Sequence, residues 1–447
     1  MKHTYTLRTA LILGATFLAH AAVGQDTPRD QQAPMNFEGQ YIASVSDADM
    51  VASAYVDGRL GPNEGHDTLS IVQLSHDPSD LRAVEVPASN SVAGPPASLD
   101  ITPDGKYAFV IETWTARPDT MTDARFSDLS PGDLLQVFDM KDPTAPTLIS
   151  QTKIPLRPDA IRVNHDGSLI AVTFHNNGGG ATSPLALFPF REGTLGEPVF
   201  PDVPGWKNTD RMIDVDWHPQ RNILAILDET GATLRFAEVG ETLDVEVIGN
   251  VVGIEKAPFR AEFTPDGQHV VVNAVYWGND IAGRWIEAPR GSVLTVRMNA
   301  DTTEGKVRHA MVSTIKTGVS PEGLAVSPDG KWVVTTNLER SYLPYNDPRI
   351  TWYSSLTLVH LDSTTGQLEK VADFAYDGIL PEAAVFDNSS RYIAVANYDH
   401  FDDRKVGGSI DFWRIETDPL DASTTHLVKT ERSIPVTRGV HSMAIAR

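Results

Sequence analysis

Four ionisable residues stand at equivalent places in a repeated sequence pattern, each just before a short apolar segment: Asp159, Glu322, Glu382 and His441. If these segments lie side by side, the four groups meet around one rim. A carboxyl group crowded by other carboxyls has a raised pKa, and a nearby histidine completes an acid/base set. Arg260, one place later in its own repeat, would stabilise a developing oxyanion. Glu322, Glu382, His441 and Arg260 are therefore the candidate catalytic residues.

A second set of residues offers contacts to a bound molecule. Its polar members lie near the same rim and its two tryptophans lie in long connections; the set comprises Asp159, His175, Asp214, Asn273, Asn337, Asn397, Trp277 and Trp352. Each kind also has a structural alternative. The acids would accept hydrogen bonds from backbone N–H groups of neighbouring units, the histidines would pack, the asparagines would cap loops, and the tryptophans would pack their own loops.

The elements that would position these groups recur six times along the chain. Each copy has an apolar segment, a polar turn and a β-rich segment, as in SLDITPDGKYAFVIE and RAEFTPDGQHVVVNA. The turn residues are spaced 62, 54, 46, 63 and 60 positions apart, at Asp104, Asp166, Gln220, Asp266, Asp329 and Ser389. Asp-Gly turns and β-branched flanks indicate hairpins. Two further β-rich segments usually follow, which predicts an all-β propeller of four-stranded antiparallel blades.

A seventh blade is expected from the two ends of the chain. Residues 50–56, 68–74 and 81–87 would supply its second, third and fourth strands. The C-terminal GVHSMAIAR aligns with a first strand and would close the ring, so that no edge strand stays exposed. The segment YIASVS, residues 41–46, could instead fill that first position, which leaves an eight-bladed ring as the alternative.

The repeat PEGLAVSPDGKWVVTTN, residues 321–337, closely resembles YVTN-type propeller repeats and is similar to the seven-bladed lactonase family. The resemblance implies hydrolysis of a sugar lactone or related ester. In such an enzyme one of Glu322, Glu382 or His441 would activate water, and Arg260 or the loop residue Arg349 would stabilise the oxyanion.

The connections between second and third strands are long, at residues 113–133, 176–184, 274–291, 338–355 and 398–409. They emerge at the rim that carries the ionisable residues, whereas the hairpins at the opposite end are minimal. Long, aromatic-rich loops over one mouth of a channel indicate a binding lid. We therefore expect a small molecule or an exported protein partner at this mouth, with hydrolysis as the alternative.

The amino-acid composition limits the partners and cofactors that can be expected. The formal net charge is −22 and no basic cluster stands out, which excludes nucleic acid as an expected partner. The chain has no cysteine, so thiol chemistry and cysteine-held metals are excluded. No cofactor motif is present and no metal ligands are assigned. A structural calcium ion would suit the acidic segment 398–403, although that segment lacks the glycine and final glutamate of an EF-hand.

The N-terminus has the pattern of a secretory signal. Lys2 and Arg8 precede an apolar run, and Ala22-Val23-Gly24 offers a cleavage site. The apolar run is shorter than the roughly 20 residues that a membrane span needs. We expect residues 1–24 as a signal peptide, 25–37 as a flexible leader and 38–447 as a single propeller domain. The mature protein would be periplasmic or secreted, with no membrane span.

Overall fold

The structure is a computed structural model that describes residues 35–63, 65–74, 81–90, 97–175, 182–207, 209–299, 308–402, 404–418 and 421–447. The expected signal peptide and the expected leader up to residue 34 lie outside the described residues. Phe37–Arg447 form one compact unit. The fold and the candidate site belong to this unit.

Seven four-stranded sheets follow one another along the described part of the chain, which confirms the predicted all-β propeller. From the inner to the outer strand they are β30 (Val440–Ala446), β1 (Tyr41–Ser46), β2 (Thr68–Gln73), β3 (Ala83–Pro87); β4 (Leu99–Ile101), β5 (Tyr107–Ile111), β6 (Leu134–Asp139), β7 (Thr147–Lys153); β8 (Pro158–Val163), β9 (Leu169–Phe174), β10 (Leu185–Arg191), β11 (Thr194–Leu195); β12 (Met212–Trp217), β13 (Ile223–Asp228), β14 (Thr233–Val239), β15 (Val245–Gly253); β16 (Pro258–Phe263), β17 (His269–Ala274), β18 (Arg290–Arg297), β19 (Ala310–Val319); β20 (Pro321–Val326), β21 (Trp332–Asn337), β22 (Ser354–Leu361), β23 (Leu368–Tyr376); and β25 (Ala383–Phe386), β26 (Tyr392–Asn397), β28 (Gly408–Asp418), β29 (Asp421–Val436).

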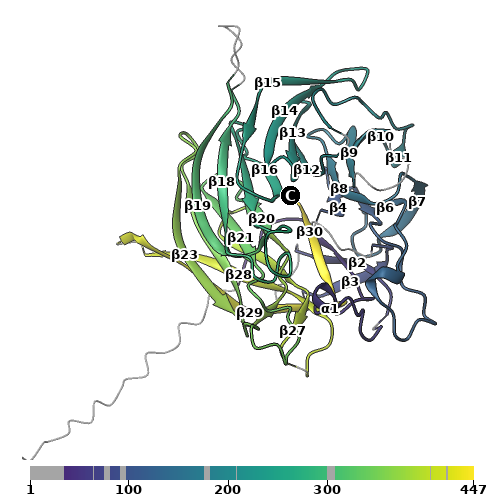
Figure 1. The fold of residues 1–447 in the computed structure, drawn as a ribbon, viewed down its shortest axis with the longest axis vertical. Helices are drawn as coiled ribbons and strands as arrows, with labels where there is room; N and C mark the ends of the chain where they lie inside the picture. The colour runs from purple at the N-terminus through teal and green to yellow at the C-terminus, as the bar shows by residue number, and fades with distance from the viewer. Residues whose placement is uncertain are drawn as a thin grey trace, which may run out of the picture. The chain divides into compact units, whose positions relative to one another are not determined.

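The inner strands close into a ring. Each contacts the inner strand of the next blade, in the order β30, β4, β8, β12, β16, β20, β25 and back to β30. Figure 1 shows β30, β4, β8, β12, β16 and β20 around the centre of the ring. Closure joins the two ends of the propeller unit in one sheet, because β30 pairs with β1, with Met443 opposite Ser44. The predicted closure by N- and C-terminal strands is therefore confirmed.

The prediction that residues 50–56 form the second strand of the closing blade is wrong. That place is taken by Tyr41–Ser46, which pairs with β30 on one side and β2 on the other, so no strand position remains for 50–56. Residues 54–57 instead form the short helix α1 (Ala54–Asp57), which ends at Gly58. With seven sheets of four strands in the described residues, the eight-bladed alternative is not found.

Packing between blades explains the apolar character of the second strands. β9, β13, β17 and β26 are buried over their whole length, because each sheet is covered on both faces by its neighbours. The outer strand β7, by contrast, has no buried residue: its first three residues are exposed, and exposed and half-buried residues alternate after them. The core is thus a set of apolar layers between adjacent sheets, such as the one that contains Phe236, Val272 and Leu294.

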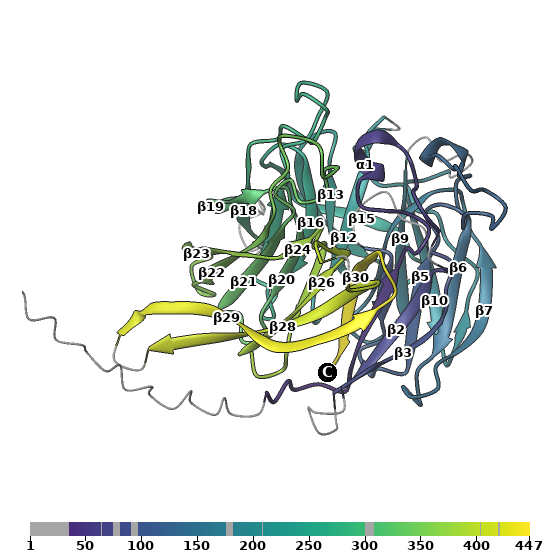
Figure 2. The same cartoon turned by 90° about the horizontal axis from the view of Figure 1, so that it is seen from below.

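Figure 2 shows α1 and the long connections on one side of the unit, with the C-terminus on the other. The connection 113–133 contains a 3₁₀ turn, Phe126–Asp128 (η2). In the connection 398–409, β27 (Asp399–His400) pairs with β24 (Gly378–Ile379), which lies between β23 and β25. The opposite side carries tight turns, in which Asp104 accepts hydrogen bonds from the Thr102 hydroxyl at 2.7 Å and the Lys106 N–H at 3.1 Å. The seven blades therefore present one loop-covered side, which we call the loop face.

Substituting Gly439 by alanine is expected to destabilise the closing blade strongly. Gly439 has φ +84°, and an added Cβ would lie 2.0 Å from the carbonyl oxygen of Asp47. Strain and overlap together should cost about 3 kcal/mol or more. Gly58→Ala is the matched control, since Gly58 has φ +72° with nothing within 4 Å, and should cost about 1 kcal/mol. Urea midpoints of both variants test this, and equal losses would contradict it.

Candidate functional site

A β-bulge at the start of several inner strands directs one side chain toward the loop face. In β20 the register shifts between Pro321 and Gly323, so that Glu322 is the bulged residue. Asp159 in β8 and His441 in β30 occupy the same position. Because a bulge re-aims the side chain it inserts, the equivalence predicted for these residues corresponds to a recurring backbone geometry.

A cavity of about 700 Å³ lies on the loop face. Its walls come from the helix α1 segment, the tops of four inner strands and three of the long connections. The lining residues are Ala54, Tyr55, Val56, Gly58, Trp114, Phe126, Arg157, Arg211, Glu229, Phe259, Trp277, Gly278, Gly283, Arg284, Trp285, Ile286, Glu322, Leu338, Tyr342 and Leu380. Glu322 and Trp277 are the two predicted site residues among them. The cavity has the size that small-molecule sites usually have.

Aromatic rings form much of the cavity wall. Trp277 meets Phe259 edge to face, with ring centroids 5.3 Å apart, and lies 6.1 Å from Trp285. Its indole Nε1 donates a hydrogen bond to the Ser320 hydroxyl at 2.9 Å, which fixes the ring. Trp114 belongs to another connection and also faces the cavity. Flat, half-buried rings of this kind offer stacking surfaces to a planar or sugar-like ligand.

Glu322 and Glu382 are adjacent buried carboxyls, 5% and 1% exposed. Burial raises the pKa of Glu322 to about 8. Burial also raises the pKa of Glu382, and the nearby carboxyls of Glu322 and Asp47 raise it further. Oε2 of Glu382 has no hydrogen-bond partner among the described residues. At neutral pH the pair therefore holds at least one proton, which makes it able both to donate and to accept one.

Asp159, predicted to bind a ligand, is held in an ion-pair network beside the cavity. Arg211 Nε lies 3.0 Å from Asp159 Oδ2, Arg211 Nη1 lies 3.1 Å from Glu229 Oε2, and His175 Nδ1 lies 3.4 Å from Asp159 Oδ2. Burial alone would raise the pKa of Asp159, but Arg211 and His175 lower it to about 2. Arg211 and Glu229, rather than Asp159 and His175, reach the cavity surface.

His441 is fully buried and does not belong to the cavity lining of the described residues. Its Nδ1 donates to the carbonyl oxygen of Gly439 at 2.8 Å, so that Nε2 accepts from the Ser98 hydroxyl at 3.2 Å. Burial lowers the pKa of His441 to about 4. The imidazole is thus neutral at physiological pH and ties the closing strand to the next blade.

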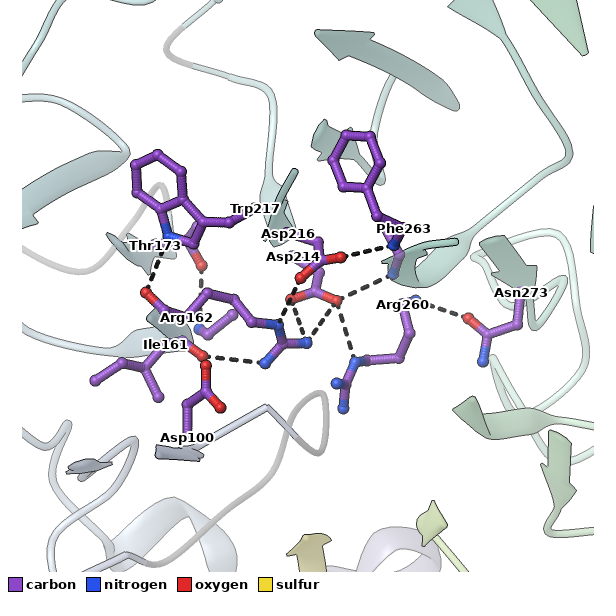
Figure 3. A network of polar contacts seen from close by, with 12 residues as sticks. Asp100, Ile161, Arg162, Thr173, Asp214, Asp216, Trp217, Arg260, Phe263 and Asn273 are labelled. Atoms are coloured by element: carbon purple, nitrogen blue, oxygen red, sulfur yellow. Dashed lines mark hydrogen bonds and ion pairs between the residues drawn. The ribbon is translucent and has the colours of Figure 1, made fainter. Parts of the chain in front are cut away.

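Asp214 and Arg260 lie in the ring of inner strands, within the network drawn in Figure 3. Asp214 Oδ1 is 2.9 Å from Arg162 Nη2, and Asp214 Oδ2 is 3.1 Å from Arg260 Nε. Asp216 accepts a hydrogen bond from the Phe263 N–H at 2.7 Å. These contacts link β8, β12 and β16, so the network ties three consecutive blades together below the cavity-facing rim.

The three predicted asparagines make hydrogen bonds within and between blades. Asn273 Nδ2 donates to the carbonyl oxygen of Glu322 at 2.9 Å and so helps to hold the bulge of β20. Asn337 donates to two hydroxyl groups of β22, each at 3.0 Å. Asn397 accepts from the Tyr376 hydroxyl at 2.9 Å. All three lie at or next to the last residue of a second strand, and Asn273 supports the backbone that presents Glu322.

Trp352 lies outside the cavity. It is 56% exposed and packs against Tyr345 and Phe401, with ring centroids 5.4 Å and 5.3 Å away. The two predicted tryptophans therefore differ, because Trp277 lines the cavity and Trp352 belongs to an exposed aromatic cluster on the loop face.

Three buried aspartates, Asp47, Asp49 and Asp67, bring carboxylate oxygens within 4.8 Å of one another. Backbone N–H groups already donate to them, for example that of Ala48 to Asp67 Oδ1 at 3.1 Å. Oxygen donors of this kind suit calcium. The acidic segment chosen for calcium from the sequence is different, since its Asp402 pairs with Arg404 at 2.8 Å. A structural calcium ion stays a prediction.

Several cavity residues were not identified from the sequence. Arg157 and Arg211 each stand directly before an inner strand. Their place in the repeat could have indicated a role at the site, because it is close to the place that Asp159 and Glu322 occupy. Tyr55 was missed for a different reason. The sequence pattern predicts a strand for residues 50–56. Tyr41–Ser46 occupies that strand position instead, so that the segment of Tyr55 forms α1 and part of the cavity wall.

These features define a seven-bladed β-propeller with long loops enclosing an aromatic cavity at one end of the ring. Three solved structures share this fold: a candidate 6-phosphogluconolactonase from Bacteroides uniformis (15% identity, 91% of this chain and 99% of that one, TM-score 0.59), another from Bacteroides fragilis (14%, 91% and 98%, 0.59) and the periplasmic gluconolactonase PpgL of Pseudomonas aeruginosa (17%, 91% and 99%, 0.59). The chain thus has the fold of the lactonase-like β-propellers.

Comparison with protein-family models and with curated proteins gives no match. In the described residues, no helix combines the length and apolar character that crossing a membrane requires.

Proposed function

We propose that this protein is exported and binds a small organic molecule in the cavity on the loop face. The observation that carries the proposal is the cavity of about 700 Å³, with aromatic walls and a few polar groups that converge on it. Its lining comes from sequence positions as distant as Ala54 and Leu380, so binding there depends on the closed ring. A ligand of about drug size would fit.

Localisation rests on different grounds from ligand binding. The pattern of residues 1–24 favours secretion, and one protein of the same fold is a periplasmic gluconolactonase. We therefore propose that the protein is periplasmic or secreted, which agrees with the N-terminal pattern and with that structural neighbour. An exported protein partner at the same mouth is the alternative occupant, and the exposed cluster of Trp352, Tyr345 and Phe401 would be its contact.

Hydrolysis of a lactone or related ester is the second candidate function, and the Glu322–Glu382 pair favours it. In this scheme the ionised carboxylate takes a proton from water, whose oxygen adds to the carbonyl carbon. The ring C–O bond then breaks, and the leaving oxygen takes the proton of the other carboxyl. Three proteins of the same fold carry lactonase names, which makes sugar lactones the first substrates to assay.

The binding proposal is tested by the melting temperature of the mature chain against sugars, sugar lactones and aromatic acids. A ligand that binds only the folded state raises the melting temperature, and the rise grows with the logarithm of the ligand concentration relative to Kd. Trp277→Ala should weaken the affinity of any hit about tenfold or more, because the ring lines the cavity. Trp352→Ala is the matched control and should leave affinity unchanged. The reverse pattern would move the ligand to the exposed aromatic cluster.

Turnover separates the two functions. If the protein is a hydrolase, Glu322→Gln and Glu382→Gln should each abolish lactone hydrolysis while binding of the intact lactone persists. If wild-type protein binds a lactone without opening it, the hydrolase candidate is wrong and the binding proposal remains.

A further inference from the structure

Three arginines line the cavity, and they differ in how their charge is neutralised. Arg211 is paired with Asp159 and Glu229. Arg284 is exposed at the edge of a long connection. Arg157 is half-buried and makes no ion pair with any described residue. Among the described residues neither Arg157 nor Arg284 forms an ion pair, and Arg157 is the more buried of the two; the carboxylate that acts on it, that of Asp159, is already paired with Arg211.

Arg157 is held in place by its surroundings. Its backbone N–H donates to the carbonyl oxygen of Gly132 at 2.9 Å, and its own carbonyl oxygen accepts from the His175 N–H at 3.0 Å. The guanidinium lies over the Trp114 ring, with Cζ 4.5 Å from the centroid. Its Nε is buried without a hydrogen-bond acceptor among the described residues. A buried donor of this kind is costly to leave unsatisfied.

The remaining charges on the lining favour an anion as the missing partner. Glu229 is already engaged by Arg211, at 3.1 Å. Glu322 holds a proton through much of the neutral range, because burial raises its pKa to about 8. The lining is thus net positive in a chain whose formal net charge is −22. The local charge is opposite to that of the whole protein.

We propose that Arg157 is the anion subsite of this cavity, and that the ligand is a carboxylate with a flat, apolar body. The carboxylate would pair with the guanidinium, as arginine and carboxylate do in their bidentate geometry. The flat body would lie against Trp277 and Trp114, which line the same cavity. This inference rests on the proposed function and specifies the chemical class of its ligand.

The test uses matched probes of one shape and different charge: 2-naphthoate, the neutral 2-naphthamide and the cationic 2-naphthylmethylamine. Affinities are measured by calorimetric titration of the mature chain. Wild-type protein should bind the carboxylate about tenfold more tightly than the amide, and the cation more weakly than either. Arg157→Gln should remove the preference for the carboxylate over the amide, and Arg157→Lys should keep part of it.

Arg404→Gln is the control, because Arg404 pairs with Asp402 at 2.8 Å outside the cavity lining, and it should keep the full preference. Arg157→Lys also serves if Arg157→Gln does not fold. Equal affinity for carboxylate and amide, tighter binding of the cation, or an unchanged preference in Arg157→Gln would overturn the subsite while leaving the cavity as a binding site. Failure of every probe and every compound of the melting-temperature panel would overturn both proposals.

Discussion

Glu322→Gln is expected to make the protein more stable above pH 8 and to leave its stability near pH 5 almost unchanged. Burial raises the pKa of Glu322 from 4.5 to about 8. A carboxyl whose pKa is raised on folding contributes stability that is complete below about pH 4.5 and lost as the pH rises through about 8. Glutamine keeps the shape and the neutral state, so it avoids a loss of up to about 5 kcal/mol.

Urea unfolding of wild type and variant from pH 5 to 9 measures this effect. The pKa values of Asp216 and Glu262 are also raised by burial, to about 8 and about 7, so the wild-type curve is a composite. The difference between the two curves isolates Glu322. Glu369→Gln, at an exposed position of outer strand β23, is the control and should give no difference. A difference curve for Glu322→Gln that is flat with pH would show that Glu322 ionises as an ordinary carboxyl.

Arg211→Met is expected to destabilise the protein by about 3 to 5 kcal/mol, because it leaves the carboxylate of Asp159 buried without its main partner. The Asp159 side chain has no solvent exposure. Its pKa is lowered to about 2 because Arg211 and His175 outweigh burial. In wild type this contribution is complete above pH 3.8 and is lost as the pH falls toward 2. Without Arg211, burial dominates and the penalty should grow from pH 4 to 7.

The double variant Asp159→Asn with Arg211→Met separates the possible causes of this loss, because it removes the Asp159 charge together with its partner Arg211. It should recover most of the lost stability at pH 7, measured by urea unfolding. Arg349→Ala removes two ion pairs near the surface, with Asp347 and Glu287, and should cost much less than Arg211→Met. If the double variant is as unstable as Arg211→Met alone, the loss comes from packing rather than from the uncompensated carboxylate.

The propeller could be predicted because the local sequence of each repeat indicates its strands and turns. Asp-Gly turns and β-branched segments specify hairpins, and the closing strand Val440–Ala446 shares the pattern of an inner strand. The closing blade was the exception. Residues 50–56 and 41–46 are both rich in small and β-forming residues, and only competition for the place beside β30 decides between them. That competition involves strands about 400 positions apart, which no local pattern records.

The candidate site could be predicted as a face and less well as a set of residues. The equivalence of Glu322, Asp159 and His441 is real as a bulge position, yet their surroundings differ. Glu322 lines the cavity, Asp159 is neutralised by Arg211, and His441 is enclosed by Ser98 and Gly439. Position along a strand follows from the repeat. The partner that each side chain meets depends on the neighbouring blade and on the loops, which the repeat does not specify.

The position of a bound ligand is the most direct test of the proposed binding site. A crystal structure of the mature chain with the tightest-binding compound of the panel measures this. We expect the compound in the cavity, against Trp277 and within hydrogen-bond distance of Arg157 or Glu322. A compound seated instead on the exposed cluster of Trp352 and Phe401, with the cavity unchanged, would contradict it.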